Sequence, residues 1–222
     1  VTGSSTEATL EYRIRDSAGT WRYVEQHVVN LLDDPDVSGL VVNLRDRTAQ
    51  HDLETSLRRA TLEDPLTGLP NRALVMDRVQ QALEREQDTG QRYAVLFVNV
   101  DRLKAINDAY GHGAGDDVLR GVADTLCALV GPADTVGRYG GDEFVVLLDS
   151  VADPHEAEAL ATRVAHALSR RVTVCGRGGV HVSACVGLTH GPAGTAEALV
   201  SAAEAAMLNA KRLGRGHVFV LE

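Results

Sequence analysis

The chain has 222 residues, of which 44% are hydrophobic and 24% are charged, and this composition is typical of a globular protein that buries a core. Its formal net charge of −9 argues against a nucleic-acid-binding surface, and no apolar run is long enough to span a bilayer. Because the sequence has no signal peptide and no C-x-x-C pair, we expect a cytoplasmic protein whose cysteines, Cys127, Cys175 and Cys185, are reduced and mostly buried.

The first 46 residues alternate between strand-like runs and turn signals. We expect three antiparallel strands at residues 9–15, 21–32 and 39–44. The turns between them lie at residues 16–19 and 33–36. This pattern, with the sequence RDRT at residues 45–48 before a helix, resembles the second half of a PAS sensor domain. A plain three-stranded meander is the alternative, because such patterns are common. We interpret residues 1–46 as the C-terminal half of a PAS-like domain.

A helical pattern follows from residue 48 to about residue 62. Leu53, Leu57 and Ala60 recur at i, i+4 and i+7 and form one apolar stripe. Such a stripe suits the seam of a short two-stranded coiled coil, and it equally suits packing on its own domain. We assign residues 47–63 to a helical linker.

From residue 64 onward, helices and strands alternate, and two hairpins interrupt the alternation. The expected helices lie at residues 73–86, 116–130, 155–170 and 195–212. The expected strands lie at residues 93–100, 134–139, 144–148, 172–175, 180–189 and 217–221. The strand at 93–100 is apolar on both faces, so we place it in the centre of its sheet. This order predicts a mixed α/β sheet with helices packed on it, in one domain spanning residues 64–222.

The sequence RYGGDEF at residues 138–144 predicts a β-hairpin with two carboxylates at its tip. We expect Gly140 and Gly141 to supply the positive φ angles of a tight turn, which places Asp142 and Glu143 side by side. Adjacent carboxylates at such a position suit a divalent metal such as Mg²⁺. A solvated turn is the alternative, since Gly and Asp are ordinary turn residues.

Four sequence motifs resemble those of the GGDEF family, the diguanylate cyclases, which join two GTP molecules into cyclic di-GMP. In chain order they are DPLTGLPNR at 64–72, NVDRLKAINDAYGHGAGD at 99–116, RYGGDEF at 138–144 and KRLGR at 211–215. The resemblance covers residue 64 to the C-terminus and implies an α+β fold, the ferredoxin-like palm of nucleotidyl cyclases and polymerases. It also implies phosphoryl transfer, in which a ribose 3′-hydroxyl attacks the α-phosphate of a second GTP.

The resemblance implies a site for Mg²⁺ or Mn²⁺ formed by Asn99, the backbone carbonyl of Val100, Asp142 and Glu143. Glu143 is also the candidate base for the attacking hydroxyl. The family usually has Asp at position 99, and Asn coordinates without bringing a charge, so we expect weaker metal binding. Asp101 lies on the same face by strand alternation and is a candidate replacement, although a cap of the next helix is the alternative role.

The resemblance further implies that Asn107 and Asp116 read the guanine edge, although Asp116 also suits the N-cap of the helix expected to begin there. Gly140 and Gly141 let the backbone approach the nucleotide. The implied phosphate ligands are the backbone amides of Arg102, Leu103 and Lys104 and the side chains of Lys104, Lys211 and Arg215. For Lys211 the alternative is a favourable charge at a helix C-terminus.

Many family members carry an Arg-x-x-Asp product-inhibition site shortly before the hairpin. Here Gly131 stands in place of the Arg, while Asp134 remains. The predicted function is a diguanylate cyclase that acts on GTP as a homodimer, because one site holds one nucleotide while the product contains two. The alternative, favoured by Asn99, is a weak or inactive GTP-binding module that regulates an attached domain such as a phosphodiesterase. Because the sequence begins with Val1, we interpret it as a fragment and expect further domains outside it.

Overall fold

The computed structural model describes residues 7–174, 177–190 and 194–221, and the chain divides into two compact units. The N-terminal unit comprises residues 1–61 and the C-terminal unit residues 62–222. Among the described residues, no helix is long and apolar enough to cross a membrane.

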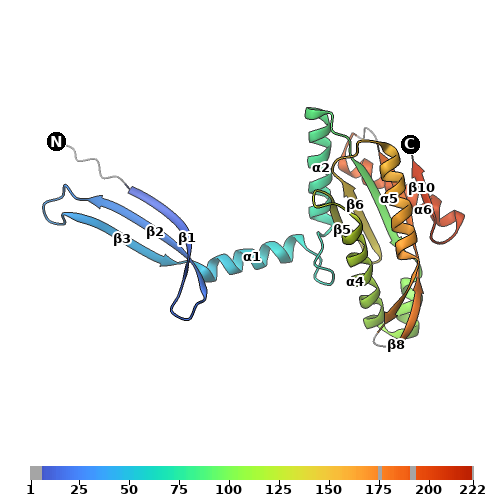
Figure 1. Cartoon of the computed structure of the whole chain (residues 1–222), viewed down its shortest axis with the longest axis horizontal. Coiled ribbons are helices and arrows are strands. Elements are labelled where there is room, and N and C mark those ends of the chain that lie inside the picture. The colour runs from blue at the N-terminus through green and yellow to red at the C-terminus, as the bar shows by residue number, and fades with distance from the viewer. Residues whose placement is uncertain (1–6, 175–176, 191–193, 222) are drawn as a thin grey trace. The chain divides into compact units, whose positions relative to one another are not determined.

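The N-terminal unit is a three-stranded antiparallel sheet followed by a helix (Figure 1). Its elements are β1 (Glu7–Arg15), β2 (Trp21–Leu31), β3 (Gly39–Asp46) and α1 (Thr48–Leu62). The strands lie in the order β1-β2-β3, which agrees with the strands and turns expected from the sequence. The likeness to a PAS domain stays a prediction, and the side chains of Leu57 and Ala60 lie outside the described residues.

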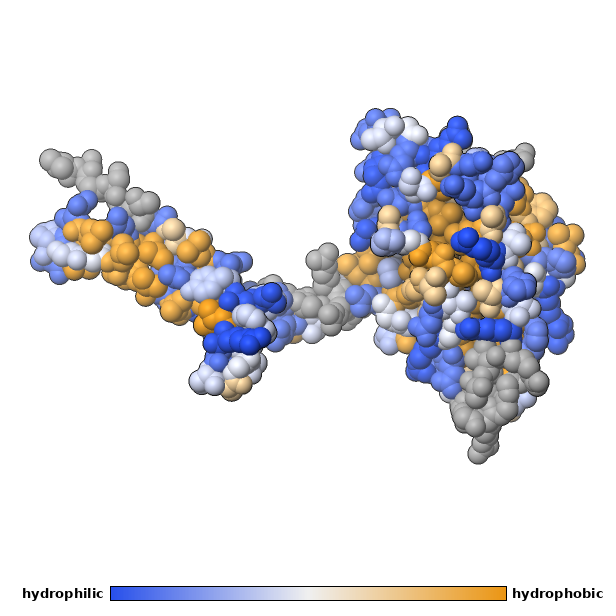
Figure 2. Space-filling view, viewed as in Figure 1, coloured by the Kyte–Doolittle hydropathy of each residue, from blue (hydrophilic) through white to orange (hydrophobic). Residues whose placement is uncertain are grey.

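One face of this sheet is apolar and exposed. Alternating residues of β1 and β3 point to the same side, as the pairing of Val28 with both Ala8 and Val42 requires. The exposed apolar side chains on this face are Leu10, Tyr12, Ile14, Leu40, Val42 and Leu44. Figure 2 shows apolar residues gathered over these strands. The opposite face carries most of the charged residues of the sheet, including Glu11, Arg13 and Arg45.

The C-terminal unit is built on a five-stranded mixed sheet in the order β10-β9-β4-β6-β5. Its strands are β4 (Ala94–Val100), β5 (Thr135–Arg138), β6 (Glu143–Leu148), β9 (Ala184–His190) and β10 (Val218–Leu221). Its helices are α2 (Arg72–Thr89), α3 (Leu103–Tyr110), α4 (His112–Leu129), α5 (Pro154–Leu168) and α6 (Ala196–Leu213). A separate two-stranded ribbon consists of β7 (Arg170–Val174) and β8 (Arg177–Val182). Among the described strands of this sheet, β9 and β10 alone pair in parallel, which confirms the expected mixed α+β class.

Helices cover both faces of this sheet. Apolar side chains of α3, α4 and α5 pack with even-numbered residues of β4, such as Leu96 and Val98. Side chains of α2 and α6 pack with Val95 and Phe97 on the other face. All seven residues of β4 are buried, as its two-sided apolar pattern predicts.

The structure corrects two element boundaries. The strand expected at 180–189 is interrupted at Ser183, so that β8 joins the ribbon and β9 joins the main sheet. The helix expected at 116–130 begins at His112, because Gly111, with a φ of 85°, ends α3 and leads directly into α4. Asp116 therefore lies in the second turn of α4, and the expectation that it caps this helix is wrong.

The cysteines follow the sequence-based expectation in part. Cys127 and Cys185 are free thiols; Cys185 is buried, but Cys127 is exposed, so the expectation of burial is wrong there. The turn expected between the strands at 172–175 and 180–189 is shorter than expected, because β8 already begins at Arg177, and Cys175 and Gly176 lie outside the described residues.

Candidate active site

The hairpin between β5 and β6 places its acidic tip as the sequence predicts, but by different backbone geometry. The backbone N–H groups of Tyr139 and Gly140 both donate to the carbonyl oxygen of Glu143, at 2.8 and 3.2 Å. Neither Gly140 nor Gly141 has a positive φ, so that expectation is wrong. A Cβ at Gly140 would instead displace the carboxylate of Glu143 by contact with its Oε2, whereas a Cβ on Gly141 would meet nothing within 4 Å.

An ion pair anchors this tip to the 64–72 segment. Nη1 of Arg138 lies 3.1 Å from each carboxylate oxygen of Asp64, and Nη2 donates to the carbonyl oxygen of Gly141 at 2.7 Å. Burial raises the pKa of Asp64, but hydrogen bonds from Thr67 and Arg138 outweigh burial and hold the pKa below its usual range. Arg138 thus anchors the tip of its own hairpin to Asp64, which lies outside the hairpin.

The central strand brings Asn99 to the acidic tip. Asn99 on β4 is the register partner of Glu143 on β6, so both side chains project toward the face covered by α2 and α6. Asn99 is 4% exposed. The N–H of Val100 donates to the carbonyl oxygen of Asp142 at 2.9 Å. The structure therefore brings together Asn99, Val100, Asp142 and Glu143, the four residues expected to hold a metal.

The pKa of Glu143 is raised, first by burial and then by the negative charges of Asp142 and Glu204. The positive charges of Lys211 and Arg72 act in the opposite direction. Sequence reasoning missed Glu204 and Arg72, which reach the tip from α6 and α2. Arg72 closes the first motif and stacks on the ring of Tyr139 at 4.7 Å, whereas Glu204 carries no signal in the sequence.

These residues form an oxygen-rich set of donors. Within the described residues, no three side chains of His, Cys, Asp or Glu are grouped to hold a metal ion. Two carboxylates, the amide oxygen of Asn99 and the carbonyl oxygen of Val100 still provide the type of ligand that Mg²⁺ and Mn²⁺ prefer, with room for water and phosphate oxygens. The set fits a divalent cation and has one acidic side chain fewer than the family usually supplies.

Asp101 does not cap a helix, and its carboxylate is hydrogen-bonded to residues outside the acidic tip. The N-cap position of α3 is Arg102, which makes no side-chain capping bond. The carboxylate of Asp101 accepts hydrogen bonds from Ser183 Oγ at 2.6 Å and Cys185 Sγ at 3.4 Å, both at the start of β9. β9 and β6 flank β4 on opposite sides, so the hydrogen bonds of the Asp101 carboxylate lie on the side of β4 opposite to Glu143.

Asn107 presents a buried acceptor at the junction of α3 and α4. Its Oδ1 is buried and has no hydrogen-bond partner. Gly115 makes room for this amide, because a Cβ at that position would collide with Oδ1. Asp116 follows directly on α4. A buried amide oxygen without a partner is costly unless a ligand supplies a donor, as the edge of a guanine base does.

The expected phosphate-binding residues lie on two segments. Lys104 is exposed in the first turn of α3, while Lys211 in the last turn of α6 and Arg215 beyond it are also exposed. The side chain of Leu103 is 8% exposed and belongs to the core, so its backbone N–H alone is available to a ligand. Arg102 has a φ of 57°, a left-handed conformation that is uncommon for residues other than glycine.

Asp134, which remains from the product-inhibition motif, has a structural role here. One carboxylate oxygen accepts from the N–H of Gly131 at 2.8 Å and the other from the N–H of Asp149 at 3.2 Å. Asp134 therefore stabilises the turn before β5.

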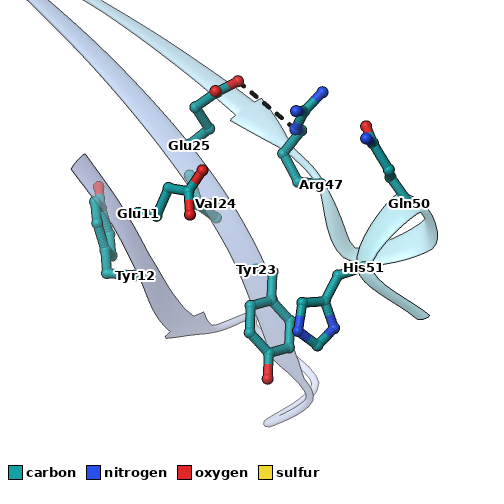
Figure 3. A pocket seen from close by; sticks show the side chains of 8 residues that line it. All are labelled: Glu11, Tyr12, Tyr23, Val24, Glu25, Arg47, Gln50 and His51. Atoms are coloured by element: carbon teal, nitrogen blue, oxygen red, sulfur yellow. Dashed lines mark ion pairs between the residues drawn. The ribbon is translucent and has the colours of Figure 1, made fainter. Parts of the chain in front are cut away.

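A pocket in the N-terminal unit, not expected from the sequence, lies where the sheet meets α1 (Figure 3). The rings of Tyr23 and His51 stack at 3.6 Å, and Nε of Arg47 lies 3.7 Å from a carboxylate oxygen of Glu25. The N–H of Arg47 donates to the carbonyl of Tyr23, and the N–H of Tyr23 donates to Thr48 Oγ1. These contacts tie the first turn of α1 to β2.

Comparison with known proteins agrees with this site. The chain is 41% identical over 193 residues to the bifunctional diguanylate cyclase/cyclic di-GMP phosphodiesterase MucR of Pseudomonas aeruginosa, covering 82% of this chain and 28% of MucR. It is 37% identical over 167 residues to the diguanylate cyclase TpbB of the same organism, covering 74% of this chain and 38% of TpbB. The chain thus spans well under half the length of these relatives.

The fold agrees as well. A crystal structure of TpbB that comprises only its GGDEF domain superimposes with a TM-score of 0.70 at 37% identity, covering 72% of this chain and 94% of that one. The family model for the diguanylate cyclase GGDEF domain matches residues 61–217, which is more than half of the chain. The chain therefore belongs to the GGDEF family.

Proposed function

We propose that this chain is the cyclase part of a bacterial signalling protein and condenses two GTP molecules into cyclic di-GMP with release of pyrophosphate. The observation that carries the proposal is the register of β4 and β6, which places Asn99 and Val100 beside Asp142 and Glu143. Family membership and the relatives named as diguanylate cyclases support it. A substrate found in the cytoplasm fits a cytoplasmic location.

In each step a ribose 3′-oxygen forms a bond to the α-phosphorus of the other GTP, and the bond to the bridging oxygen of the pyrophosphate breaks. Glu143 would accept the proton of the attacking hydroxyl. Asp142, Glu143, the amide of Asn99 and the carbonyl of Val100 would hold Mg²⁺ or Mn²⁺. The bound ion supplies charge neutralisation at the phosphates.

Asn107 and Asp116 would select guanine over adenine. The unpaired Oδ1 of Asn107 would accept a hydrogen bond from the guanine edge, and the carboxylate of Asp116 would accept from its N–H groups. Phosphate binding would use the backbone at Arg102–Lys104 and the side chains of Lys104, Lys211 and Arg215. The influence of Lys211 on Glu143 supports a position of this cation near the acidic tip.

A second candidate function is a GTP-binding module with little or no turnover that regulates an attached domain. The buried, uncharged Asn99 at the metal-binding position favours it. The name of MucR, which joins cyclase and phosphodiesterase, shows that GGDEF domains occur beside such a partner domain.

Incubation of the purified chain with GTP and either Mg²⁺ or Mn²⁺, followed by mass identification of the product, tests the proposal. Cyclic di-GMP that is absent from the Glu143→Ala variant supports the cyclase. GTP binding without product under both metals supports the regulatory module instead. Equal binding of GTP and ATP contradicts both functions.

A further inference from the structure

A small hydrogen-bond network joins the end of β4 to the start of β9. Ser183 Oγ donates to Oδ2 of Asp101 at 2.6 Å, and the N–H of Asp101 donates to the carbonyl oxygen of Ser183 at 2.8 Å. The sulfur of Cys185 lies 3.4 Å from Oδ1 of Asp101. Ser183 and Cys185 lie 82 and 84 positions after Asp101 in the chain.

The same sulfur reaches a third segment. Cys185 Sγ lies 3.4 Å from the carbonyl oxygen of Gly214, the residue directly before Arg215. Cys185 is fully buried, and burial raises the pKa of its thiol, as does the carboxylate of Asp101. The thiol therefore keeps its proton at neutral pH and can donate it to Asp101 or to Gly214.

The backbone next to Asp101 is held in an uncommon conformation. Arg102 is left-handed, and this conformation orients the first N–H groups of α3, where the phosphate nest is proposed. A non-glycine residue stays in this region only when its surroundings hold it there. The bonds of Asp101 to Ser183 and Cys185 provide such a constraint on the preceding residue.

We infer that Asp101, Ser183 and Cys185 are positioning residues that fix the separation between two phosphate-binding segments, residues 102–104 and residues 211–215. The inference rests on the proposed function, because it assumes that both segments bind the triphosphate of one GTP. The three residues act through the backbone amides of α3 and through Arg215. Two segments that bind one flexible chain of phosphates work together only if the distance between them is fixed before binding.

The guanine-binding residues stand outside this network. Asn107 and Asp116 are positioned by the packing of α3 on α4 around Gly115. Loosening the network should therefore weaken contacts to the β- and γ-phosphates and leave contacts to the base intact. This selectivity separates a positioning role from a general contribution to folding.

The test is calorimetric titration of GTP and of GMP, with a chelator present so that no turnover occurs. Cys185→Ala removes the thiol donor, Cys185→Ser keeps a donor, and Cys127→Ala is the matched control on an exposed cysteine. We expect Cys185→Ala to lower the affinity for GTP roughly tenfold and to leave the affinity for GMP unchanged. Tenfold is the smallest loss of affinity usually seen when a residue that hydrogen-bonds to a metal ligand is removed, and we expect a similar loss here. Cys185→Ser should recover most of the loss, and Cys127→Ala should match the wild-type chain.

Ser183→Ala supplies a second test that leaves the buried thiol in place, and it should show the same selective loss. If GTP and GMP affinities fall together, or if neither changes in the Cys185→Ala and Ser183→Ala variants, the inference is overturned while the proposed function stands. A wild-type chain that binds neither nucleotide, or binds both equally, contradicts the proposed phosphate site itself.

Discussion

At the scale of single residues, the site depends on which side chains share one face of one strand. The motifs identified the residues, but their juxtaposition depends on register: Asn99 meets Glu143 because β4 and β6 pair as they do. Strand alternation alone also placed Asp101 on that face, yet its carboxylate bonds to Ser183 and Cys185. Such long-range partners have no signal in local sequence, so this part of the site was not predictable.

Position 99 offers a direct test of the metal site. Asn99→Asp should raise turnover with Mg²⁺, since two unit charges about 4 Å apart attract by roughly 4 kcal/mol at an effective dielectric near 20. With Asn99 in place, activity should be low with Mg²⁺ and partly recovered with Mn²⁺. The matched control is Asn43→Asp, which adds the same charge at an exposed position of β3. Unchanged rate and metal affinity in Asn99→Asp would show that position 99 is not a ligand.

The two glycines of the tip should respond differently to the same change. Gly140→Ala displaces the carboxylate of Glu143, because the new Cβ would collide with Oε2, and we expect at least a tenfold lower rate of product formation. A Cβ on Gly141 meets no protein atom within 4 Å, so Gly141→Ala should leave Glu143 in place and lower the rate less, only as far as the new Cβ hinders the approach of the nucleotide. Steady-state rates of both variants, with thermal unfolding to confirm the fold, make the comparison. Equal rates would mean that the placement of Glu143 does not limit catalysis.

At the scale of elements, periodicity and capping were sufficient for most boundaries. Asp153 caps α5 and Thr195 caps α6, close to the helix starts expected at residues 155 and 195, and β4 is central as its apolar run predicts. The start of α4 was missed because the glycine-rich stretch at residues 111–115 reads as a turn. Only Gly111 in that stretch has a positive φ, and Gly115 is required for space beside Asn107.

The Arg138–Asp64 ion pair should make stability depend on pH. The pKa of Asp64 is lower in the folded chain than its ordinary value near 4, so the pair stabilises fully above that value and is lost as the pH falls through the folded pKa. Arg138→Met should lower the free energy of unfolding by about 2 kcal/mol at pH 7, a value between those for exposed and for buried ion pairs. The loss should be smaller at about pH 3. Denaturant unfolding at both pH values measures this.

Arg120→Met is the matched control, because its pair with Asp117 is more exposed, and the change should cost under about 1 kcal/mol. If the cost of Arg138→Met is the same at both pH values, the ion pair does not contribute as described.

The turn before β5 should not support tight product inhibition. With Gly131 in place of Arg, the motif itself supplies no guanidinium fork, and the carboxylate of Asp134 is occupied by two backbone N–H groups. Titration of cyclic di-GMP should show no high-affinity site that depends on Asp134. A tight site that disappears in Asp134→Ala but not in the exposed control Asp124→Ala would contradict this.

At the scale of the whole molecule, the two units differ in the features that their described residues carry. The C-terminal unit carries every residue of the proposed chemistry, and its exposed large apolar residues among those described, Tyr110, Leu208 and Leu213, are few. The N-terminal unit carries an exposed apolar sheet face and the pocket at its junction with α1. The residues of the proposed chemistry and the exposed apolar sheet face thus lie in different parts of the sequence.

Turnover should require two chains, because each proposed site holds one GTP and the product contains two. Specific activity should therefore fall when the protein is diluted below its dimer dissociation constant, while the affinity for a single GTP stays constant. Activity measured over a dilution series, with the dimer fraction followed by analytical ultracentrifugation, tests this. A specific activity that is independent of dilution would indicate that one chain suffices.

The junction of β3 and α1 leaves only Arg47 between the sheet and the helix, and its N–H is bonded to the strand beside it. The rotational phase of the helix is therefore set by the sheet. Adding one residue after Arg47 would turn every later side chain of α1 by about 100° around the helix axis, whereas adding seven would return it to within roughly 20°. The length of this joint, counted in residues, thus determines the direction in which Leu53 faces.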